Sequence, residues 1–570
     1  MGVFDAVVGP VDNALTGLFG QWNAYSTAIV TTLVVVVSYY MMNMSDPDTH
    51  PGLLARQASP SRVRQEGESA TYRSRYIPES MPLTTGLNVK DAGASKWSRG
   101  RDGDLRDIWK RAVTGGSQDD GPVAGKTGRI LTVLGTQNII EHSLDDITRQ
   151  INLIGQHISQ QGGSRVALYL PNSIELIATL FACSFHDLTP IILPFDQPDE
   201  HVIDMLRRSA ADTVVTAPGS FPFDSVVQAY PALRQLIWVV DEGNKHLDWN
   251  EVPKGMGSSV NVSTWSDILC DSPADAKTAV PERSDKQPKP IVTFWAYKSG
   301  ETEEMVEFTH GNIASGIAGQ LSAIPSVDRF SPSDLFLPAD PLANIHTLVL
   351  TLAALYSNAS VAFNSVAGGS DDIVLATQGI APTVLVAPPA MLLKAHEEMM
   401  DKIGALPRKV IHGFQSRSLS QYGVMPGASS NDSLRPAIGT TPGKLRLVFV
   451  AERAGAGTKP LSSSVLSGMR IFTGARIVYA LSAAKVAGAV TQTHVHDYRV
   501  HQDGEYSHFG CPLVCTEFML RDQGYHMTTD SKAEGEIIVR GPCVSGGEAS
   551  VGEVGKIRED YTLGYAENSG

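Results

Sequence analysis

Apolar residues beyond position 129 alternate between two spacings. Short apolar runs, such as residues 164–173, end at turn residues and predict buried strands. The following residues, 174–185, repeat apolar side chains at helical spacing. The same alternation recurs over residues 189–218, 358–365, 382–395 and 444–452. Because strands that alternate with helices form parallel sheets with right-handed crossovers, we expect a doubly wound α/β fold.

The N-terminal part shows a different pattern. Residues 25–42 carry no charge and would form about 27 Å of helix, close to the hydrocarbon thickness of a bilayer. We therefore predict a transmembrane helix over 25–44. A cleaved signal peptide is disfavoured because no Lys or Arg precedes the run and no small-residue cleavage site follows it. Arginines follow the run, so we expect a short lumenal segment 1–24 and the main domain in the cytosol. The expected location is a single pass through the endoplasmic reticulum membrane.

Residues 45–126 form the next distinct segment. They are rich in Ser, Arg, Gly, Asp and Pro, and they show little apolar periodicity. A segment of this composition buries too little apolar surface to fold. We therefore predict a mostly disordered linker, in which Trp97 and Trp109 dock locally on the main domain.

Composition narrows the class of protein. A chain of 570 residues is too long for one compact core, so two or three domains are expected. The net charge of −14 argues against nucleic acid as a partner. Five cysteines in so long a chain indicate a reducing compartment, and Cys511 and Cys515 are interpreted as buried thiols because no second pair stands at zinc-ligand spacing. These features predict no particular protein partner.

Five segments resemble, in order along the chain, motifs of the adenylate-forming (AMP-binding) superfamily, and within it the acyl-CoA synthetases. They are SRVALYLPNSIELIATLFACSFHDLTPIILPF (164–195), VLVAPPAMLL (384–393), LRLVFVAERAGAGTKPLSSSVLSGMRIF (445–472), GEIIVRGPCVSGG (535–547) and GEVGKIREDYTLGYA (552–566). The resemblance implies the large N-terminal domain of that fold over 127–550, with doubly wound sheets, helices and a smaller β subdomain. It also implies that 551–570 is a hinge remnant and that the family's C-terminal lid is absent, unless the sequence is a truncated gene model.

Members of this superfamily join a carboxylate to the α-phosphate of ATP, release pyrophosphate and pass the acyl group to CoA. The resemblance therefore implies ATP or AMP, Mg²⁺ and CoA as cofactors, and a small-molecule acyl substrate. We expect a lipophilic carboxylate and a membrane lipid partner, because the predicted anchor would hold the domain at a bilayer.

The stretch FWAYKSGETEEMVEFTHGN (294–312) resembles the superfamily's phosphate-binding loop, in which glycine N–H groups and a lysine surround the phosphates. The first half of that motif is kept at Tyr297, Ser299, Gly300 and Thr302, and the second half at Val306, Thr309 and His310. The resemblance assigns four catalytic residues, namely Lys298, Ser299, Thr302 and His310. Taken alone, the same stretch would be an ordinary polar surface turn.

The centre of this loop has changed its charge. Glu303, Glu304 and Met305 stand where the superfamily has Gly-x-Pro-Lys-Gly. Together with Glu301, these carboxylates are expected to face the phosphates, at a cost on the order of 1–4 kcal/mol for each pair of like charges. Lys298 is the one cation expected to compensate.

The resemblance also predicts a nucleotide-binding pocket. YALSAAKVAG (479–488) matches the superfamily's Tyr-Gly-x-Thr-Glu, so Tyr479 is expected to stack on adenine and Ser482 keeps a hydroxyl. Ala483 replaces the Glu that holds Mg²⁺, and a methyl group cannot ligate a hard cation. Glu553 stands at the position of the ribose-binding Asp. The predicted nucleotide-binding residues are Gly300, Gly455, Gly457, Tyr479, Ser482 and Glu553, and no residue is assigned to a metal.

Histidines provide two further candidates. Asn344 replaces the superfamily's acyl-site histidine in PLANIH (341–346), and His346 is interpreted as a core histidine whose N–H is satisfied. His494, His496 and His501 are of a residue type that binds transition metals, but we favour solvated loop histidines.

Two functions stay open from the sequence. One is a membrane-anchored, long-chain acyl-CoA ligase that activates a lipophilic carboxylate through an acyl-adenylate. The other is a catalytically inactive pseudoenzyme that binds lipid or nucleotide as a scaffold. Loss of the loop lysine, the magnesium Glu and the lid lysine favours the second, because each such group lowers the barrier by on the order of a few kcal/mol. Family descent favours the first.

Overall fold

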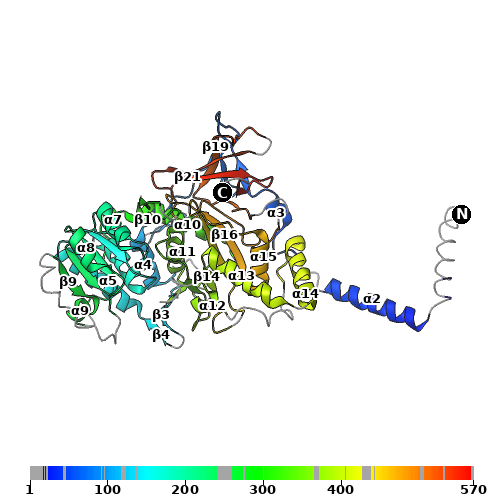
Figure 1. Ribbon diagram of the computed structural model, residues 1–570, viewed down its shortest axis with the longest axis horizontal. Coiled ribbons are helices and arrows are strands. Elements are labelled where there is room, and N and C mark those ends of the chain that lie inside the picture. Colours follow the sequence, from blue (N-terminus) through cyan, green and yellow to red (C-terminus); the bar gives the residue numbers. More distant parts are fainter. Residues whose placement is uncertain are drawn as a thin grey trace. The chain divides into compact units, whose positions relative to one another are not determined.

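The computed structural model describes residues 17, 20, 23–42, 46–90, 93–95, 97–116, 124–135, 138–240, 260–273, 277–298, 301–364, 371–404, 406–426, 438–441, 443–500, 506–530 and 533–566. The chain divides into two compact units, Met1–Asp48 and Thr49–Gly570. Figure 1 labels the elements of both units.

The first unit contains helix α2 (Ala24–Met42), which begins after Asn23 because the Asn23 side chain accepts hydrogen bonds from the first free N–H groups. Among the described residues, no helix is long and apolar enough to cross a membrane, so the transmembrane helix predicted over 25–44 is not found. Hydroxyl groups interrupt the apolar run, and those of Thr27 and Thr32 donate to backbone carbonyls one turn earlier. Most of the predicted lumenal segment 1–24 lies outside the described residues, and the expected cellular location stays a prediction.

A seven-stranded sheet in the second unit has the order β11-β10-β6-β5-β7-β8-β9 and is parallel except for the β10–β11 pair. Its strands are β5 (Arg165–Tyr169), β6 (Thr189–Ile192), β7 (Thr213–Thr216), β8 (Gln235–Trp238), β9 (Asn261–Thr264), β10 (Ile291–Trp295) and β11 (Glu304–Phe308). Its helices are α5 (Leu144–Gln160), α6 (Ile174–Phe185), α7 (Asp199–Ser209), α8 (Phe223–Ala229) and α9 (Trp265–Cys270).

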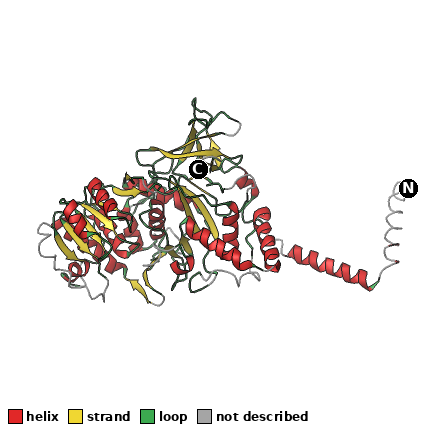
Figure 2. Cartoon of the chain, in the orientation of Figure 1, coloured by secondary structure: helices red, strands yellow, loops and turns green. Residues whose placement is uncertain are grey.

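The alternation of side chains along β5 shows why this sheet is covered on both faces. Val166 and Leu168 belong to the core that includes α5 and α6, whereas Ala167 and Tyr169 belong to a second core with α7 and α8. Figure 2 shows helices around these strands. The doubly wound α/β fold predicted from apolar spacing is confirmed here.

A nine-stranded sheet has the order β18-β17-β16-β15-β14-β12-β13-β3-β4, with a parallel centre from β16 to β3 and antiparallel edges. Its strands are β3 (Ile130–Leu134), β4 (Asn138–His142), β12 (Leu335–Pro338), β13 (Ser360–Asn364), β14 (Val384–Val386), β15 (Leu447–Arg453), β16 (Arg476–Ser482), β17 (Thr491–Gln492) and β18 (Cys511–Pro512). The helices of this region are α10 (His310–Ala323), α11 (Ile345–Tyr356), α12 (Ile373–Ala376), α13 (Pro389–Ile403), α14 (Leu406–Arg417), η3 (Ser418–Tyr422) and α15 (Ser463–Thr473).

The third sheet joins the two ends of the second unit. It is antiparallel, with the order β1-β2-β19-β20-β21-β22. Its strands are β1 (Ala58–Pro60), β2 (Tyr72–Ser74), β19 (Glu517–Arg521), β20 (Glu534–Arg540), β21 (Glu548–Ile557) and β22 (Leu563–Tyr565). Because β1 and β2 come from the segment predicted to be a disordered linker, that prediction is wrong for much of 45–126.

Helices α3 (Pro51–Ala55) and α4 (Leu105–Thr114) also lie within the segment that was predicted to be disordered. Leu105, Ile108 and Trp109 in α4 are fully buried. The Trp109 ring packs against Phe181 at 5.1 Å between centroids, and its N–H donates to Thr148 over 3.1 Å. Trp109 therefore docks as expected, whereas Trp97 is 91% exposed. The apolar face of α4 is a single narrow stripe in a polar sequence, which is why its helical pattern was missed.

Candidate functional site

A glycine turn, Ala454–Gly457, follows strand β15 and forms the centre of the candidate site. Gly455 and Gly457 have φ values of 75° and 71°, a conformation that favours glycine. The Ala454 N–H donates to the Ser482 carbonyl at the end of β16 over 2.9 Å. The Gly455 N–H donates to the Glu553 carboxylate over 3.0 Å. Three of the predicted nucleotide-binding positions, Gly455, Gly457 and Glu553, are therefore neighbours.

The loop after β10 lies directly against this turn. A Cβ added to Gly455 would come within 2.6 Å of the Tyr297 ring, and one added to Gly457 within 2.8 Å of the Lys298 side chain. Lys298 is thus beside the turn, as the resemblance implied. Ser299 and Gly300 lie outside the described residues, and Thr302 is exposed.

The carboxylates of the loop point in different directions. Glu304 accepts a hydrogen bond from the Tyr297 hydroxyl and pairs with Lys485 over 3.0 Å. Burial, and then the Glu304 carboxylate, raise the pKa of the Tyr297 hydroxyl. The Tyr297 side chain therefore connects the glycine turn, through its ring, with the ion pair between Glu304 and Lys485, through its hydroxyl.

Glu303 does not face the turn with Glu304, which corrects the expectation of three clustered carboxylates. It is buried and pairs with His201 on α7 over 2.8 Å, and its backbone carbonyl accepts from Arg208 over 2.7 Å. The hydrogen bond to Glu303 raises the pKa of His201. Glu301 is exposed.

A buried carboxyl group lies near the end of β15, just before the glycine turn in the chain. Glu452, the residue before Arg453 in β15, is 1% exposed and accepts hydrogen bonds from the hydroxyls of Thr458 and Tyr479. Burial raises the pKa of this carboxyl to about 7. The group is therefore largely protonated below neutral pH, and it connects the segment after the glycine turn to β16.

Tyr479 takes part in this buried network. Its ring is fully buried against Phe509, with 5.3 Å between centroids, and its hydroxyl accepts from the Leu461 N–H over 2.8 Å. In this conformation no face of the ring is open to an adenine base, so the predicted stacking lacks a free surface. Ser482 is also buried, and its hydroxyl donates to the Glu452 backbone carbonyl over 2.9 Å.

Both ring nitrogens of His310 contact backbone groups in this structure. Its Nδ1 accepts from the Leu105 N–H over 3.4 Å, and its Nε2 lies 3.0 Å from the Lys289 carbonyl. Burial lowers the pKa of His310 to about 4, so the ring is neutral. These contacts join α4 to the start of α10, and they leave neither ring nitrogen for the catalytic role that the resemblance assigned.

His346 lies in the core, as interpreted from the sequence, and burial lowers its pKa to about 4. Its Nε2 has no hydrogen-bond partner among the described residues, so the expectation that its N–H is satisfied is wrong for that atom. The neighbouring Asn344 donates to Asp340 over 2.8 Å.

His496 is buried beside Asp328, at 3.3 Å, rather than solvated. Within the described ranges, no group of three or more His, Cys, Asp or Glu side chains is placed to hold a metal ion.

Two cations near the turn were missed by sequence reasoning. Lys485 is one, and Arg453 is the other. The Arg453 guanidinium lies over the Trp295 ring at 4.9 Å and donates to the Ala296 carbonyl over 3.2 Å. Burial lowers its pKa, and its Nε is buried without a hydrogen-bond partner in the described part of the chain. Both residues lie within motif-like stretches, Arg453 in 445–472 and Lys485 in 479–488, but neither was assigned a role there, and only the fold shows their contacts.

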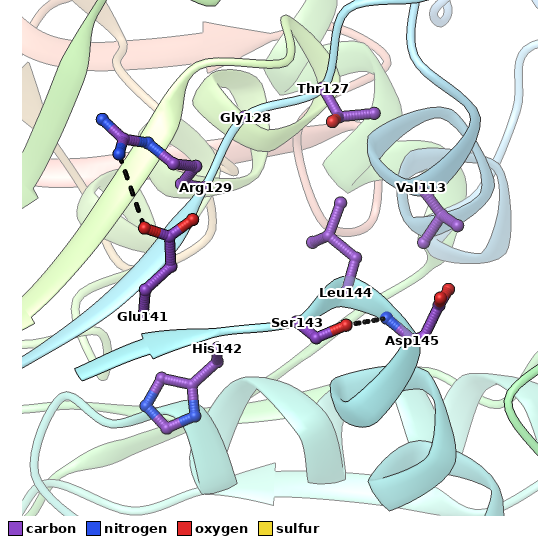
Figure 3. A pocket seen from close by; sticks show the side chains of 9 residues that line it. All are labelled: Val113, Thr127, Gly128, Arg129, Glu141, His142, Ser143, Leu144 and Asp145. Carbon is purple, nitrogen blue, oxygen red and sulfur yellow. Dashed lines mark hydrogen bonds and ion pairs between the residues drawn. The ribbon is translucent and has the colours of Figure 1, made fainter. Parts of the chain in front are cut away.

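A separate pocket of about 300 Å³ lies at the β3–β4 hairpin and the start of α5 (Figure 3). Arg129 and Glu141 form an ion pair of 3.4 Å at its rim. None of the residues assigned to the nucleotide or catalytic site lines this pocket. The pocket is therefore distinct from the glycine turn.

Comparison with known solved proteins agrees with this geometry at the level of the fold. The A domain of a carboxylic acid reductase from Segniliparus rugosus, solved with AMP and a co-purified carboxylic acid, has a TM-score of 0.57 at 13% identity, over 81% of this chain and 74% of that chain. An anthranilate CoA ligase solved with anthranoyl-AMP has a TM-score of 0.56 at 14% identity, over 81% of this chain and 77% of that chain.

Relatives in sequence are more informative about the class of protein. Peroxisomal long chain acyl-CoA synthetase 7 of Arabidopsis thaliana is 24% identical over 67% of this chain and 52% of the relative, so this chain spans about half the length of that relative. Long chain acyl-CoA synthetase 8 of the same organism is 22% identical over 98% of this chain and 77% of the relative. An uncharacterized protein of Saccharomyces cerevisiae is 33% identical over 57% of this chain and 54% of the relative.

The family model described as "AMP-binding enzyme" matches residues 138–547, which is well over half of the chain. This match includes β15, the glycine turn and the loop after β10. The protein therefore belongs to the AMP-binding enzyme family.

Proposed function

We propose that the protein binds a lipophilic carboxylate together with an adenine nucleotide, or their acyl-adenylate, in the manner of long-chain acyl-CoA synthetases. We also propose that it forms acyl-adenylate much more slowly than those enzymes do. The family model and the acyl-CoA synthetase relatives support the ligand class. The arrangement of charges at the glycine turn supports the slow reaction.

The observation that carries this proposal is the position of Glu304. Its carboxylate is held by Lys485 and by the hydroxyl of Tyr297, whose ring contacts the turn that the family uses for nucleotide. A triphosphate near this carboxylate would meet a like charge, at a cost on the order of 1–4 kcal/mol for each close pair. An adenylate carries fewer negative charges and would be penalised less.

The residues present do not fit the magnesium ion that the family implies. Ala483 offers no oxygen ligand, and it is 3% exposed. The nearest acidic residue in β15, Glu452, already accepts hydrogen bonds from Thr458 and Tyr479. This position therefore offers a magnesium ion no free oxygen ligand from Ala483 or Glu452.

The contact expected for the ribose is better preserved. Glu553 accepts from the Gly455 N–H and is only partly buried, so its carboxylate is near the turn in a position to accept a ribose hydroxyl. Gly457, in the same turn as Gly455, lies against the Lys298 side chain. The ribose of a ligand thus has an acceptor in Glu553, whereas Tyr479 offers no free face for adenine stacking.

A full acyl-CoA ligase is the second candidate. It is favoured by three cations, Lys298, Lys485 and Arg453, that lie near the loop or the turn. If Glu304 moves away on binding, these cations would stabilise the charge that develops on the α-phosphate.

A pyrophosphate-release assay on the full chain, with MgATP and a panel of fatty acids, separates the two candidates. We expect turnover far below that of a typical ligase, and we expect Lys298→Ala to abolish any residual activity. Lys394→Ala, an exposed lysine on α13, is the matched control. Robust turnover that is insensitive to Lys298→Ala would overturn the proposal.

A further inference from the structure

Helix α14 and the following turn η3 present an unusual outer face. Val410 is 51% exposed and Phe414 is 69% exposed. Arg417 follows at the next turn of the same face, because positions separated by four and seven residues align on a helix. Lys409, also exposed, flanks Val410. Large apolar side chains are thus placed between cations on a surface open to solvent.

The inner face of the same helix is well anchored. His412 stacks on Phe472 of α15, with 5.2 Å between ring centroids. In η3, which directly follows α14, Leu419 is fully buried in a small core with Ile471 and Tyr498. Figure 1 shows α14 on the outside of α13 and α15. The exposed face is therefore a fixed feature of a packed helix, and its apolar side chains cannot turn inward without losing these contacts.

The charge of this segment is opposite to that of the chain. Residues 406–422 contain three cations, Arg408, Lys409 and Arg417, and no carboxylate, while the whole chain carries a net charge of −14. A helix with apolar side chains at its centre and Lys or Arg at the flanks is suited to the interface of a bilayer, where apolar groups enter the acyl boundary and cations meet anionic headgroups.

We propose that this outer face, Lys409, Val410, Phe414 and Arg417, docks the protein on an anionic lipid surface. An acidic protein needs such a local basic patch to approach an anionic bilayer. The apolar side chains between the cations would then enter the boundary between the headgroups and the acyl chains. The inference stands on the exposure and charge of α14 and does not depend on the proposed function.

A fluorescent label tests the contact at this face alone. In the full chain, Cys270→Ser removes the exposed thiol, and Phe414→Cys then carries an environment-sensitive fluorophore. Vesicles of phosphatidylserine and phosphatidylcholine should shift its emission to the blue, and added salt should weaken the effect. Val327→Cys, at a residue that is 85% exposed elsewhere, is the matched control and should show no shift.

Charge reversal gives a second readout. Lys409→Glu combined with Arg417→Glu should lower vesicle partitioning about 25-fold or more, since each cation near an anionic surface contributes roughly fivefold. Arg234→Glu combined with Lys286→Glu changes the net charge equally at exposed sites outside α14, and it should have a much smaller effect. An equal shift with pure phosphatidylcholine vesicles, a shift without vesicles as the protein concentration rises, or unchanged partitioning of the α14 double variant would each overturn the proposal. The second of these outcomes would indicate a second copy of the chain as the occupant.

Discussion

Replacing Glu452 with Gln tests the buried network beneath the glycine turn. Burial raises the pKa of this carboxyl from 4.5 to about 7. The folded state therefore holds the proton more tightly than the unfolded state does. The stabilisation that this bound proton gives to the folded state is fully present below about pH 4.5 and is lost as the pH rises through 7. Gln mimics the protonated carboxyl in size and polarity but cannot ionise.

The expected magnitude follows from the same values. A tenfold change in proton affinity corresponds to about 1.4 kcal/mol, so complete ionisation of Glu452 should lower the free energy of unfolding by about 3 kcal/mol. Roughly 2.5 kcal/mol of this loss falls between pH 5 and pH 8. The wild-type protein should lose this amount relative to Glu452→Gln over that range.

Urea unfolding at several pH values measures the difference directly. Both proteins are followed from pH 5 to pH 8, and the change in their difference in unfolding free energy is compared with the predicted value. Glu397→Gln, at an exposed carboxylate on α13, serves as the control and should leave the pH dependence unchanged. Parallel curves for wild type and Glu452→Gln would refute the reasoning, because they would mean that Glu452 ionises alike in the folded and unfolded chain.

Three further predictions concern the site and the corrected N-terminal segment. Gly455→Ala adds a Cβ within 2.6 Å of the half-buried Tyr297 ring, so it should weaken AMP binding in calorimetry, whereas Gly546→Ala has a similar φ with no atom within 4 Å and should not. Tyr479→Phe leaves the Leu461 N–H without its partner and should cost about 1–3 kcal/mol in urea unfolding. Trp109→Ala should cost about 3–5 kcal/mol, while Trp97→Ala should cost almost nothing; equal effects would mean that α4 does not pack as described.

Local apolar spacing was sufficient for the elements whose stabilising contacts lie on a repeated face. The helix predicted over 174–185 agrees with α6 (Ile174–Phe185), because its apolar side chains contact both neighbours and the sheet. The pairing of β2 with β19 joins residues more than 400 positions apart, and no local pattern contains that information. This distant pairing is what orders a segment whose composition alone indicates disorder.

The candidate site also combines residues that the sequence could predict with contacts that only the fold determines. Positions such as Gly455 and Glu553 were found by resemblance, and the hydrogen bond between them brings them together. The partners of the loop carboxylates, His201 and Lys485, come from distant parts of the chain, and nothing in the sequence indicated that they pair with these carboxylates. Tyr479 points inward because it contacts Glu452 and Phe509. Its residue type alone predicted a ring face open to adenine, and this packing covers that face.

The central claim is that the glycine turn accepts an adenylate more readily than a triphosphate. Isothermal titration calorimetry of the full chain, with a non-hydrolysable acyl-adenylate analogue, AMP and MgATP, measures this directly. Glu304→Gln serves as the informative variant and Glu301→Gln, an exposed carboxylate of the same loop, as its control. The account predicts that the adenylate analogue and AMP bind at least as tightly as MgATP, and that Glu304→Gln selectively strengthens MgATP binding. Much tighter binding of MgATP to the wild-type chain, unaffected by Glu304→Gln, would contradict it.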